Sequence, residues 1–338
     1  MSQGRLVRLS HVKLSFFQTK PEKSAGPLRR ALQYALYDWT RDMSWSGRLL
    51  TTIALLVQLG GLVFAVIEPK TKPLMFVALL IYMTGLLLMN GTLTSEFVRK
   101  TQLEADQIAA EQIQQTLHPQ KVGELPGYQL ETFYKPLRGV GGDYFDIIAL
   151  PNGRTLFALA DVSGKGMPAA LLAANIQALV RSISNVASDP LSVANHVNNH
   201  LCCYTPPERF ATAVFALLSP ETGELTYVNA GQNPPILSTS GCTTFLESTG
   251  FPLGLVREAQ FQCQSVIIPP GGKLLFLTDG LTDGIEGPNP EERVCEAIRT
   301  DAAKAMSRIT SLLNPRFNED DVTILLLTRL SDDTRHGV

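Results

Sequence analysis

Four short stretches of this sequence place aspartates beside small residues, where extended apolar runs begin or end. The stretches are Gly141-Gly142-Asp143 with Asp146, Asp161-Val162-Ser163-Gly164, Thr278-Asp279-Gly280 and Asn318-Glu319-Asp320-Asp321. Mg2+ and Mn2+ prefer oxygen ligands, so carboxylates that converge from several strand ends could hold two such ions. A metal lowers the pKa of a bound water, which can then attack a phosphoryl centre as hydroxide. Any one Asp-Gly pair is explained equally well as a turn, but four such stretches together favour a metal site.

Other motifs for phosphate chemistry are incomplete in this sequence. The segment around Gly164-Lys165 lacks both the first glycine and the hydroxyl residue of a phosphate-binding P-loop. Cys203 and Arg209 have the spacing of cysteine phosphatases, but two prolines between them remove backbone donors and Glu208 would repel an anion. No G-x-S-x-G motif supports a serine nucleophile. The sequence therefore favours metal chemistry on aspartates over covalent catalysis.

The part of the chain that carries these aspartates is a mixture of strand and helix patterns. We predict strands at 128–134, 155–162, 210–219, 224–231, 273–280 and 321–330, a hairpin turn at 220–223, and helices at 168–187, 190–203 and 291–313. The stretch 141–146 is expected to close a further extended run. Because strands and helices do not alternate regularly, we expect an α+β domain, arranged as a layered sandwich.

Two uncharged apolar runs, 49–67 and 74–89, precede this domain and are separated by the short stretch EPKTKP. A helix needs about 20 apolar residues to cross a bilayer, so we predict a transmembrane helical hairpin, with a pair of buried core helices as the alternative. Lys and Arg outnumber Asp and Glu before the first run. This bias places the N-terminus in the cytoplasm, and two crossings return the rest of the chain there.

Composition excludes several classes of protein. Hydrophobic residues make up 45% of the 338 residues, and the apolar excess is concentrated in the two runs. The part after the hairpin has more acidic than basic side chains, which argues against nucleic acid as a partner. The five cysteines form no C-x-x-C pair, which argues against a disulfide framework or a zinc site.

Two further segments have helical patterns. Residues 28–46 place apolar side chains at helical spacing with arginines among them, which predicts an amphipathic helix on the inner membrane surface, or else an ordinary soluble helix. Residues 95–119 predict a second helix, in which Leu103, Ala110 and Leu117 recur every seven residues. This short heptad pattern is typical of a coiled-coil dimer, although a single helix packed on the next domain would give the same pattern.

Residues 110–330 resemble the metal-dependent protein phosphatase (PPM) family, in the bacterial serine phosphatase branch typified by SpoIIE and RsbU. The motifs that carry the resemblance are, in order, AEQIQQTLHP, GVGGDYFD, ADVSGKGMPAALLAA, PPERFATAVFALLSPETGELTYVNAGQNPP, GFPLGL, LFLTDGLTD and NEDDVTILL. Residues 1–94 lie outside it. The family often has a histidine where this chain has Gln232, and we expect no ligand role for that position.

The resemblance implies a PPM-type α-β-β-α sandwich with two Mn2+ or Mg2+ ions at one edge. The ligands that it implies are four aspartates and one backbone carbonyl: Asp143, Asp161, Asp279, Asp320 and Val162. Asp161 would bridge both ions. Asp143 and the carbonyl of Val162 would complete one site, and Asp279 and Asp320 would complete the other.

The sequence assigns no definite role to several residues near the expected ligands. The sequence leaves open whether Asp146, Asp283 or Asp321 act as ligands through water. We expect Lys165 to be exposed to solvent, with substrate docking as the alternative. Pro168 suits the first turn of the helix that follows.

The resemblance also implies the activity of a serine/threonine protein phosphatase, in which a hydroxide activated by two metal ions attacks phosphorus without a phosphoenzyme. The usual substrate in this branch is a phosphorylated STAS-type anti-sigma-factor antagonist in a partner-switching pathway. Two alternatives are a membrane scaffold that binds a phosphoprotein or STAS partner without turnover, and a metal-dependent hydrolase of a small phosphoester.

Together these expectations divide the chain into five parts. They are a cytoplasmic N-terminal segment with the amphipathic helix at 1–47, a transmembrane hairpin at 48–93, a linker helix at 94–120, a PPM-type phosphatase domain at 121–330 and a tail at 331–338. The protein would lie in the inner (cytoplasmic) membrane, with the N-terminus and the catalytic domain in the cytoplasm. We expect the linker helix to couple the membrane segment to the active site, within a homodimer.

Overall fold

The structure, a computed structural model, describes residues 45–67, 72–117, 119, 125–137, 139–184, 189–240, 242–314 and 319–331. The chain divides into two compact units, Met1–Asp106 and Gln107–Val338. The amphipathic helix expected at 28–46 falls almost wholly outside the described residues, and so does the tail expected at 331–338.

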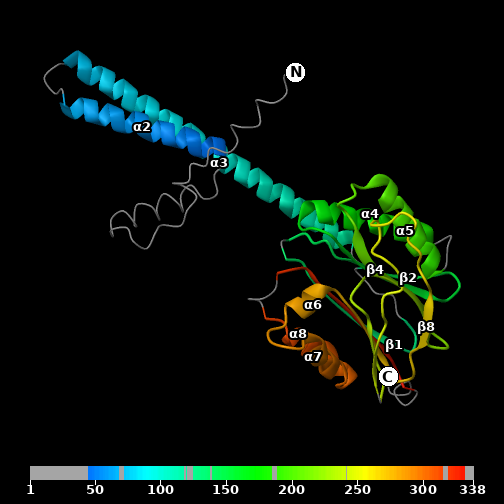
Figure 1. Cartoon of the computed structure of the whole chain (residues 1–338). Coiled ribbons are helices and arrows are strands. Elements are labelled where there is room, and N and C mark those ends of the chain that lie inside the picture. The colour runs from blue at the N-terminus through cyan, green and yellow to red at the C-terminus, as the bar shows by residue number, and fades with distance from the viewer. Residues whose placement is uncertain are drawn as a thin grey trace. The chain divides into compact units, whose positions relative to one another are not determined.

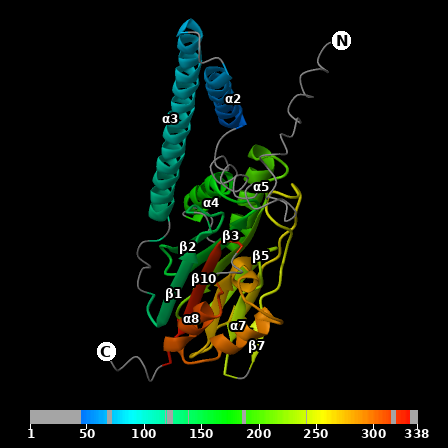
Figure 2. The same cartoon turned by 90° about the vertical axis from the view of Figure 1, so that its left-hand side faces the viewer.

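The first unit contains two antiparallel helices, α2 (Trp45–Ile67) and the first part of α3 (Lys72–Leu117), which lie side by side in Figure 1 and Figure 2. Small residues lie where the helices meet. Ala54 is fully buried, and a Cβ atom on Gly85 would come 3.1 Å from the carbonyl oxygen of Ala54. The hydroxyls of Thr51 and Thr92 are 3.5 Å apart. Close approach at small residues is typical of helices that pack in membranes, and the helical hairpin expected from the sequence is present.

Among the described residues, one helix is long and apolar enough to cross a membrane, Phe76–Leu117, and Leu49–Gly60 forms a shorter apolar helix. Large apolar side chains of the long helix are exposed, for example Phe76, Leu80 and Leu87. The helix expected as a linker is the direct continuation of this same helix, because α3 runs without a break to Leu117.

The second unit is built from two five-stranded antiparallel sheets. The first sheet has the order β1-β10-β9-β6-β7, with bounds β1 (Tyr128–Lys135), β10 (Val322–Arg329), β9 (Lys273–Leu277), β6 (Ile236–Ser238) and β7 (Thr243–Phe245). The second has the order β2-β3-β4-β5-β8, with bounds β2 (Tyr144–Ala149), β3 (Thr155–Val162), β4 (Ala211–Ser219), β5 (Glu224–Ala230) and β8 (Gln264–Ile267). Figure 2 shows β1 beside β10 in the first sheet and β2 beside β3 in the second.

Helices cover the outer face of each sheet. Figure 1 shows α4 (Met167–Ser184) and α5 (Pro190–Tyr204) on one side of the strands, and α6 (Asp279–Asp283), α7 (Pro290–Ile298) and α8 (Ala302–Ser311) on the other. The predicted α-β-β-α sandwich is therefore confirmed. The hairpin turn predicted at 220–223 is confirmed as well, since it joins β4 to β5.

Strand β3 shows why the sequence contains continuous apolar runs. Phe157 and Leu159 point into the core between the two sheets, whereas Leu156 and Ala158 belong to the core under α4 and α5. Successive side chains of a strand face opposite sides, so a strand that is covered on both sides must be apolar throughout. The rings of Phe157 and Phe276 stack across the sheets with centroids 5.7 Å apart.

Three sequence predictions need correction. The helix predicted at 291–313 is two helices, α7 and α8, which are separated by residues 299–301. Asp301 takes the N-cap position of α8, for which aspartate is favoured. The run at 141–146 does not end an extended segment, because β2 begins after Asp143. The short strands β6, β7 and β8 were not predicted, because three or four residues are too few to show a period of two.

Candidate metal centre

The four expected aspartates come from one edge of the sandwich. In the second sheet, β2 and β3 are antiparallel and Tyr144 pairs with Ala160, so Asp143 before β2 lies beside the end of β3, which carries Asp161. In the first sheet, β10 and β9 are antiparallel, so the start of β10 lies beside the end of β9. Asp320 precedes β10 and Asp279 follows β9. Each sheet thus supplies one pair of carboxylates.

Hydrogen bonds hold the loop between β3 and α4 to the two residues that precede β4. Ser163 donates its N–H to the carbonyl of Phe210 at 2.9 Å, and its Oγ accepts the N–H of Phe210 at 3.0 Å. The guanidinium of Arg209 donates to the Ser163 carbonyl at 2.9 Å. Gly164 and Gly166 have φ angles of +97° and +73°, which favour glycine because other residues are strained there. The loop therefore fixes where Asp161, Val162 and Lys165 lie.

Asp143 is held by two threonines from the opposite sheet. Its side chain is buried, and its Oδ2 accepts hydrogen bonds from Thr278 Oγ1 at 2.9 Å and from Thr323 Oγ1. Among the described residues, no hydrogen bond is found to Oδ1. One oxygen is thereby oriented by the protein, and the other is left available as a ligand.

Asp279 and Asp320 lie at the two strand ends of the first sheet. Asp279 is the first residue of α6, where the helix N-terminus favours negative charge. Asp320 accepts the N–H of Asp321 on Oδ1 at 2.9 Å, and its Oδ2 lies 2.8 Å from the ammonium nitrogen of Lys165. Lys165 is exposed, as the sequence predicted, but its charge is already paired.

Burial and neighbouring carboxylates raise the pKa of Asp143, Asp161 and Asp279. Burial and the neighbouring carboxylates of Asp279 and Asp320 raise the pKa of Asp161 to about 7. Burial, together with the charge of Asp161, raises the pKa of Asp143 well above its usual range. Burial and the charge of Asp320 raise the pKa of Asp279. Such a concentration of negative charge is costly unless cations neutralise it.

The donors at this edge fit a pair of hard divalent cations. Carboxylates and a backbone carbonyl are the ligands that Mg2+ and Mn2+ prefer. A Cβ atom on Gly142 would come 3.0 Å from the Val162 carbonyl oxygen, so the absence of a side chain there keeps this oxygen accessible. Among the described residues, however, no group of three or more Asp, Glu, His or Cys side chains lies close enough together to hold a metal ion. In this arrangement Asp320 is paired with Lys165 and not with its fellow carboxylates.

Asp321 serves the site as a clamp. Its Oδ1 accepts the N–H of Leu137 at 2.7 Å, and its Oδ2 accepts the N–H of Gly142 at 2.6 Å. The N–H of Asp143 also bonds to this carboxylate. Both oxygens are thus used to hold the loop that carries Asp143, which favours a positioning role for Asp321 over a ligand role.

Asp146 has a partner of its own. It is completely buried and forms two hydrogen bonds with Arg181 of α4, from Nε to Oδ2 at 2.6 Å and from an Nη to Oδ1 at 3.0 Å. This pair fastens β2 to α4. Asp283, by contrast, is exposed on α6, and its charge contributes to the raised pKa of Asp279.

Two glutamines organise the surroundings of the site. Gln232 is buried, donates to the carbonyl of Leu277 at 3.2 Å and accepts from Thr212, which agrees with the expectation that it is not a ligand. Gln114, at the end of α3, donates to the carbonyl of Gly141 at 2.7 Å and accepts the N–H of Gly141 at 3.0 Å. The last turns of α3 are thus bonded to the loop of Asp143.

The sequence did not reveal the roles of Thr278, Thr323 and Gln114. Thr278 and Thr323 meet because the N–H of Thr278 bonds to the carbonyl of Thr323 at 3.1 Å across neighbouring strands. The only sequence signal is that each threonine stands within three residues of an expected ligand, in TDG and DDVT. Nothing in the sequence relates either threonine to Asp143, which is at least 135 positions away.

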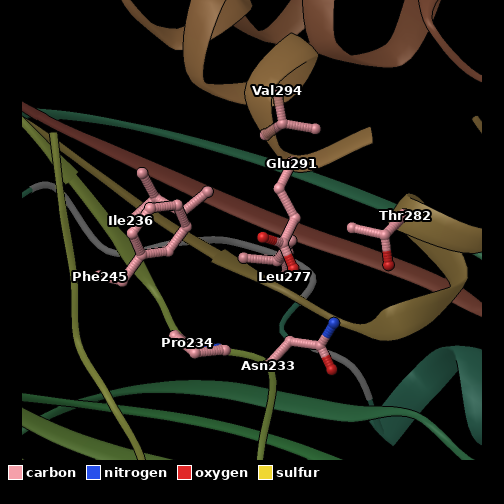
Figure 3. A pocket seen from close by; sticks show the side chains of 8 residues that line it. All are labelled: Asn233, Pro234, Ile236, Phe245, Leu277, Thr282, Glu291 and Val294. Carbon is pink, nitrogen blue, oxygen red and sulfur yellow. The ribbon is translucent and has the colours of Figure 1, made fainter. Parts of the chain in front are cut away.

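The second unit also contains a small pocket beside α6, the helix that begins with Asp279. Figure 3 shows it between the β6–β7 hairpin and helices α6 and α7, with Asn233, Thr282 and Glu291 among the side chains that line it. Its cavity volume is about 10 Å³, which is far less than that of typical small-molecule sites. None of the expected ligands lines this pocket, so it is not the metal centre.

Comparison with known proteins identifies the family. The sequence profile described as "Stage II sporulation protein E (SpoIIE)" matches residues 151–330, which is more than half of the chain and includes Asp161, Asp279 and Asp320. The chain belongs to the SpoIIE family. Its two sheets and flanking helices are the PPM phosphatase fold that the sequence predicted.

Relatives of this SpoIIE-family chain come from several bacteria. Protein IcfG of Synechocystis is 28% identical over 51% of this chain and 32% of its own length. The phosphoserine phosphatase RsbU of Bacillus subtilis is 26% identical over 65% of this chain and 69% of its own length. The structure of the RsbU and RsbW domains of a Mycobacterium tuberculosis protein is 27% identical and covers 61% of both chains with a TM-score of 0.54. The chain thus spans about a third of IcfG and about two thirds of RsbU.

Proposed function

We propose that this chain is a metal-dependent serine/threonine protein phosphatase. The observation that carries this proposal is the meeting of four aspartates from two sheets at one edge, where burial and mutual repulsion raise the pKa of Asp143, Asp161 and Asp279. Such a site is built to receive cations. Membership of the SpoIIE family and the name of the relative RsbU, phosphoserine phosphatase, agree with this activity.

The residues that would hold two Mn2+ or Mg2+ ions are Asp143, Asp161, Asp279, Asp320 and the carbonyl of Val162. When bound, such ions supply an acidified water as nucleophile and neutralise charge on the phosphoryl oxygens. The protein's own part is orientation. Thr278 and Thr323 fix one oxygen of Asp143, and the bonds of Ser163 to Phe210 fix the loop that follows Asp161.

We propose that the substrate is a phosphorylated STAS-type anti-sigma-factor antagonist in a partner-switching pathway. The support for this substrate is the resemblance to the SpoIIE and RsbU branch. None of the expected ligands lines the small pocket of Figure 3. A protein substrate is compatible with an edge at which Asp161, Asp279 and Asp320 are only partly buried.

We also propose that α2 and α3 cross the inner membrane as a hairpin, with the N-terminus and the phosphatase domain in the cytoplasm. The support is the membrane-length apolar helix Phe76–Leu117 and the close packing of small residues between α2 and α3. Helix α2 has 23 residues, and about 20 are needed to cross a bilayer.

We propose that the continuous helix α3 couples the membrane segment to the active site. Its last turns bond to the loop of Asp143 through Gln114, and its exposed apolar side chains include Leu103 and Ile113. We propose that two copies of the chain pair through this stretch as a homodimer. A movement of the paired helices would then shift Gly141 and, with it, the expected ligand Asp143.

Hydrolysis of p-nitrophenyl phosphate and of a phosphoserine peptide tests the proposed activity. The full-length protein is assayed with Mn2+ and with EDTA, beside Asp161→Ala and the exposed control Glu291→Gln. We expect Mn2+-dependent turnover that the control retains and Asp161→Ala loses by at least a hundredfold, about 3 kcal/mol in activation free energy.

The other outcomes separate the alternatives. Turnover that neither EDTA nor Asp161→Ala affects would refute the metal assignment. Turnover of p-nitrophenyl phosphate alone, with no action on any phosphopeptide or phosphorylated STAS protein, would indicate a hydrolase of small phosphoesters. Binding of a phosphoprotein without any turnover would indicate a scaffold.

A further inference from the structure

Lys165 brings a positive charge to the acidic edge. Its Nζ lies 2.8 Å from Asp320 Oδ2 and donates to the backbone carbonyl of Glu319. Three ion pairs are found among the described residues, and this is the one that involves an expected metal ligand. The side chains of Lys165 and Asp320 are 43% and 32% exposed, so the pair lies at the mouth of the site.

The backbone fixes the position from which the Lys165 side chain starts. Gly164 and Gly166 flank it with positive φ angles. On the other side, Ser163 is bonded to Phe210 and to Arg209. The lysine is therefore presented to Asp320 by a rigid loop.

The charge of Lys165 reaches further than Asp320. It opposes the effect of burial on both Asp161 and Asp279, since it lowers the pKa of each. Asp279 and Asp320 are the two carboxylates expected to complete the second ion's site, and Asp161 is expected to bridge both ions. Lys165 thus acts on every carboxylate around the second position.

We propose that Lys165 is an internal cation that competes with the second metal ion for Asp320. The inference rests on the proposed function, because it takes Asp279 and Asp320 as the ligands of that ion. An oxygen that accepts a hydrogen bond from an ammonium group has less charge to offer a metal, and a divalent cation beside the ammonium is repelled by it. The second ion must therefore displace Lys165 from Asp320, which weakens its binding. Without that ion, Lys165 compensates part of the negative charge.

Titration with Mn2+ tests this competition. Free Mn2+ is followed by electron paramagnetic resonance with the full-length wild-type protein and with Lys165→Met, which removes the charge and keeps the length of the side chain. We expect Lys165→Met to bind the weaker of the two ions at least fivefold more tightly. Lys165→Arg, which keeps the charge, and Lys304→Met, which removes an exposed lysine from α8, should bind as the wild type does. If Lys165→Met does not fold, Lys165→Gln serves the same comparison.

Thermal unfolding distinguishes competition from a merely structural tether. Competition predicts that Lys165→Met unfolds at a lower temperature than the wild type in EDTA and at the same or a higher temperature in saturating Mn2+, because tighter binding adds stability. A structural tether would lower the unfolding temperature in both solutions. Mn2+ binding that Lys165→Met leaves unchanged or weakens would overturn the inference alone. A wild-type protein that binds no Mn2+ would overturn the proposed function and the inference together.

Discussion

At the scale of single residues, the adjacent aspartates Asp320 and Asp321 have different tasks. Asp320 is partly exposed and meets a lysine ammonium, whereas Asp321 is buried and uses both oxygens to accept backbone N–H groups of the 137–143 segment. A metal ion can replace the exposed Lys165 ammonium at Asp320, whereas binding to Asp321 would leave backbone N–H groups without their acceptor. The two residues are therefore expected to respond differently to the same substitution.

Asp320→Asn and Asp321→Asn test this difference. Asp320→Asn should weaken Mn2+ binding and change the free energy of unfolding in EDTA by less than about 1 kcal/mol, because it removes only an exposed ion pair. Asp321→Asn should lower that free energy by about 2 kcal/mol, because an amide cannot accept all of the N–H bonds that the carboxylate accepts. Urea unfolding in EDTA measures both. Equal losses in the two variants would contradict the assignment of Asp321 as a clamp.

Asp161 should make the stability of the metal-free protein depend on pH. Its pKa in the folded protein, about 7, lies above its ordinary value of 3.8, so between these values the folded state binds more protons than the unfolded state. Stability must then fall as the pH rises from about 4 to 7 and remain low above 7. In EDTA, we expect Asp161→Asn to be more stable than the wild type at pH 8, by up to about 3 kcal/mol, and to be no more stable at pH 4.

Urea unfolding of the wild type and of Asp161→Asn between pH 4 and pH 8 measures this effect. Glu291→Gln on α7 is the control for the loss of one exposed negative charge. A pH dependence that Asp161→Asn shares in full with the wild type would show that Asp161 does not carry it. In saturating Mn2+ at pH 8, the wild type should be more stable than Asp161→Asn, because only the wild type keeps Asp161 as an expected metal ligand.

At the scale of elements, the site depends on contacts that fasten neighbouring layers. The buried pair Asp146–Arg181 joins β2 to α4, and the Gln114–Gly141 bonds join the end of α3 to the segment before β2. Both contacts lie within three residues of Asp143 in the sequence, at Gly141 and Asp146. Substitutions that break either contact are expected to shift Asp143 through the backbone.

Arg181→Met should cost about 3 kcal/mol of stability, because it leaves Asp146 buried without its cation. The double variant Arg181→Met with Asp146→Asn should recover part of that loss, since no buried charge remains. Urea unfolding measures both variants. Full retention of stability in Arg181→Met would contradict a structural role for the pair.

Gln114→Leu should weaken Mn2+ binding several-fold, because it frees both backbone groups of Gly141 and loosens the loop of Asp143. Gln115→Leu is the matched control, since Gln115 is the next residue on the same helix and is exposed. Calorimetric titration with Mn2+ gives both affinities. Equal affinities in the two variants would refute the coupling of α3 to the site through Gln114.

At the scale of the whole molecule, the long helix α3 runs without a break from an apolar stretch of membrane length to Gln114, which bonds to Gly141. If α2 and α3 cross the membrane, the full-length protein should stay in the membrane fraction after extraction at high pH and should dissolve only in detergent. A variant with Leu80→Lys and Leu87→Lys should be released, because each charge at the centre of a membrane-spanning helix costs about 3 kcal/mol. Extraction of the wild-type protein without detergent would contradict the anchor.

The sequence by itself determined the family and the layered fold, because these depend on motifs and patterns within short segments. The expected ligands follow from the resemblance to the family and stay a prediction. The β-rich apolar runs predicted the longer strands, and the stretches with aspartates beside small residues indicated where strands begin or end. The tertiary structure decided which carboxylates are free to bind ions. Asp143 meets Thr278 and Thr323, Asp321 meets Gly142, and Lys165 meets Asp320 only because the strands of two sheets end at the same edge. These partners are between 135 and 180 positions apart, and the register of the sheets, which no local pattern records, sets which side chains meet.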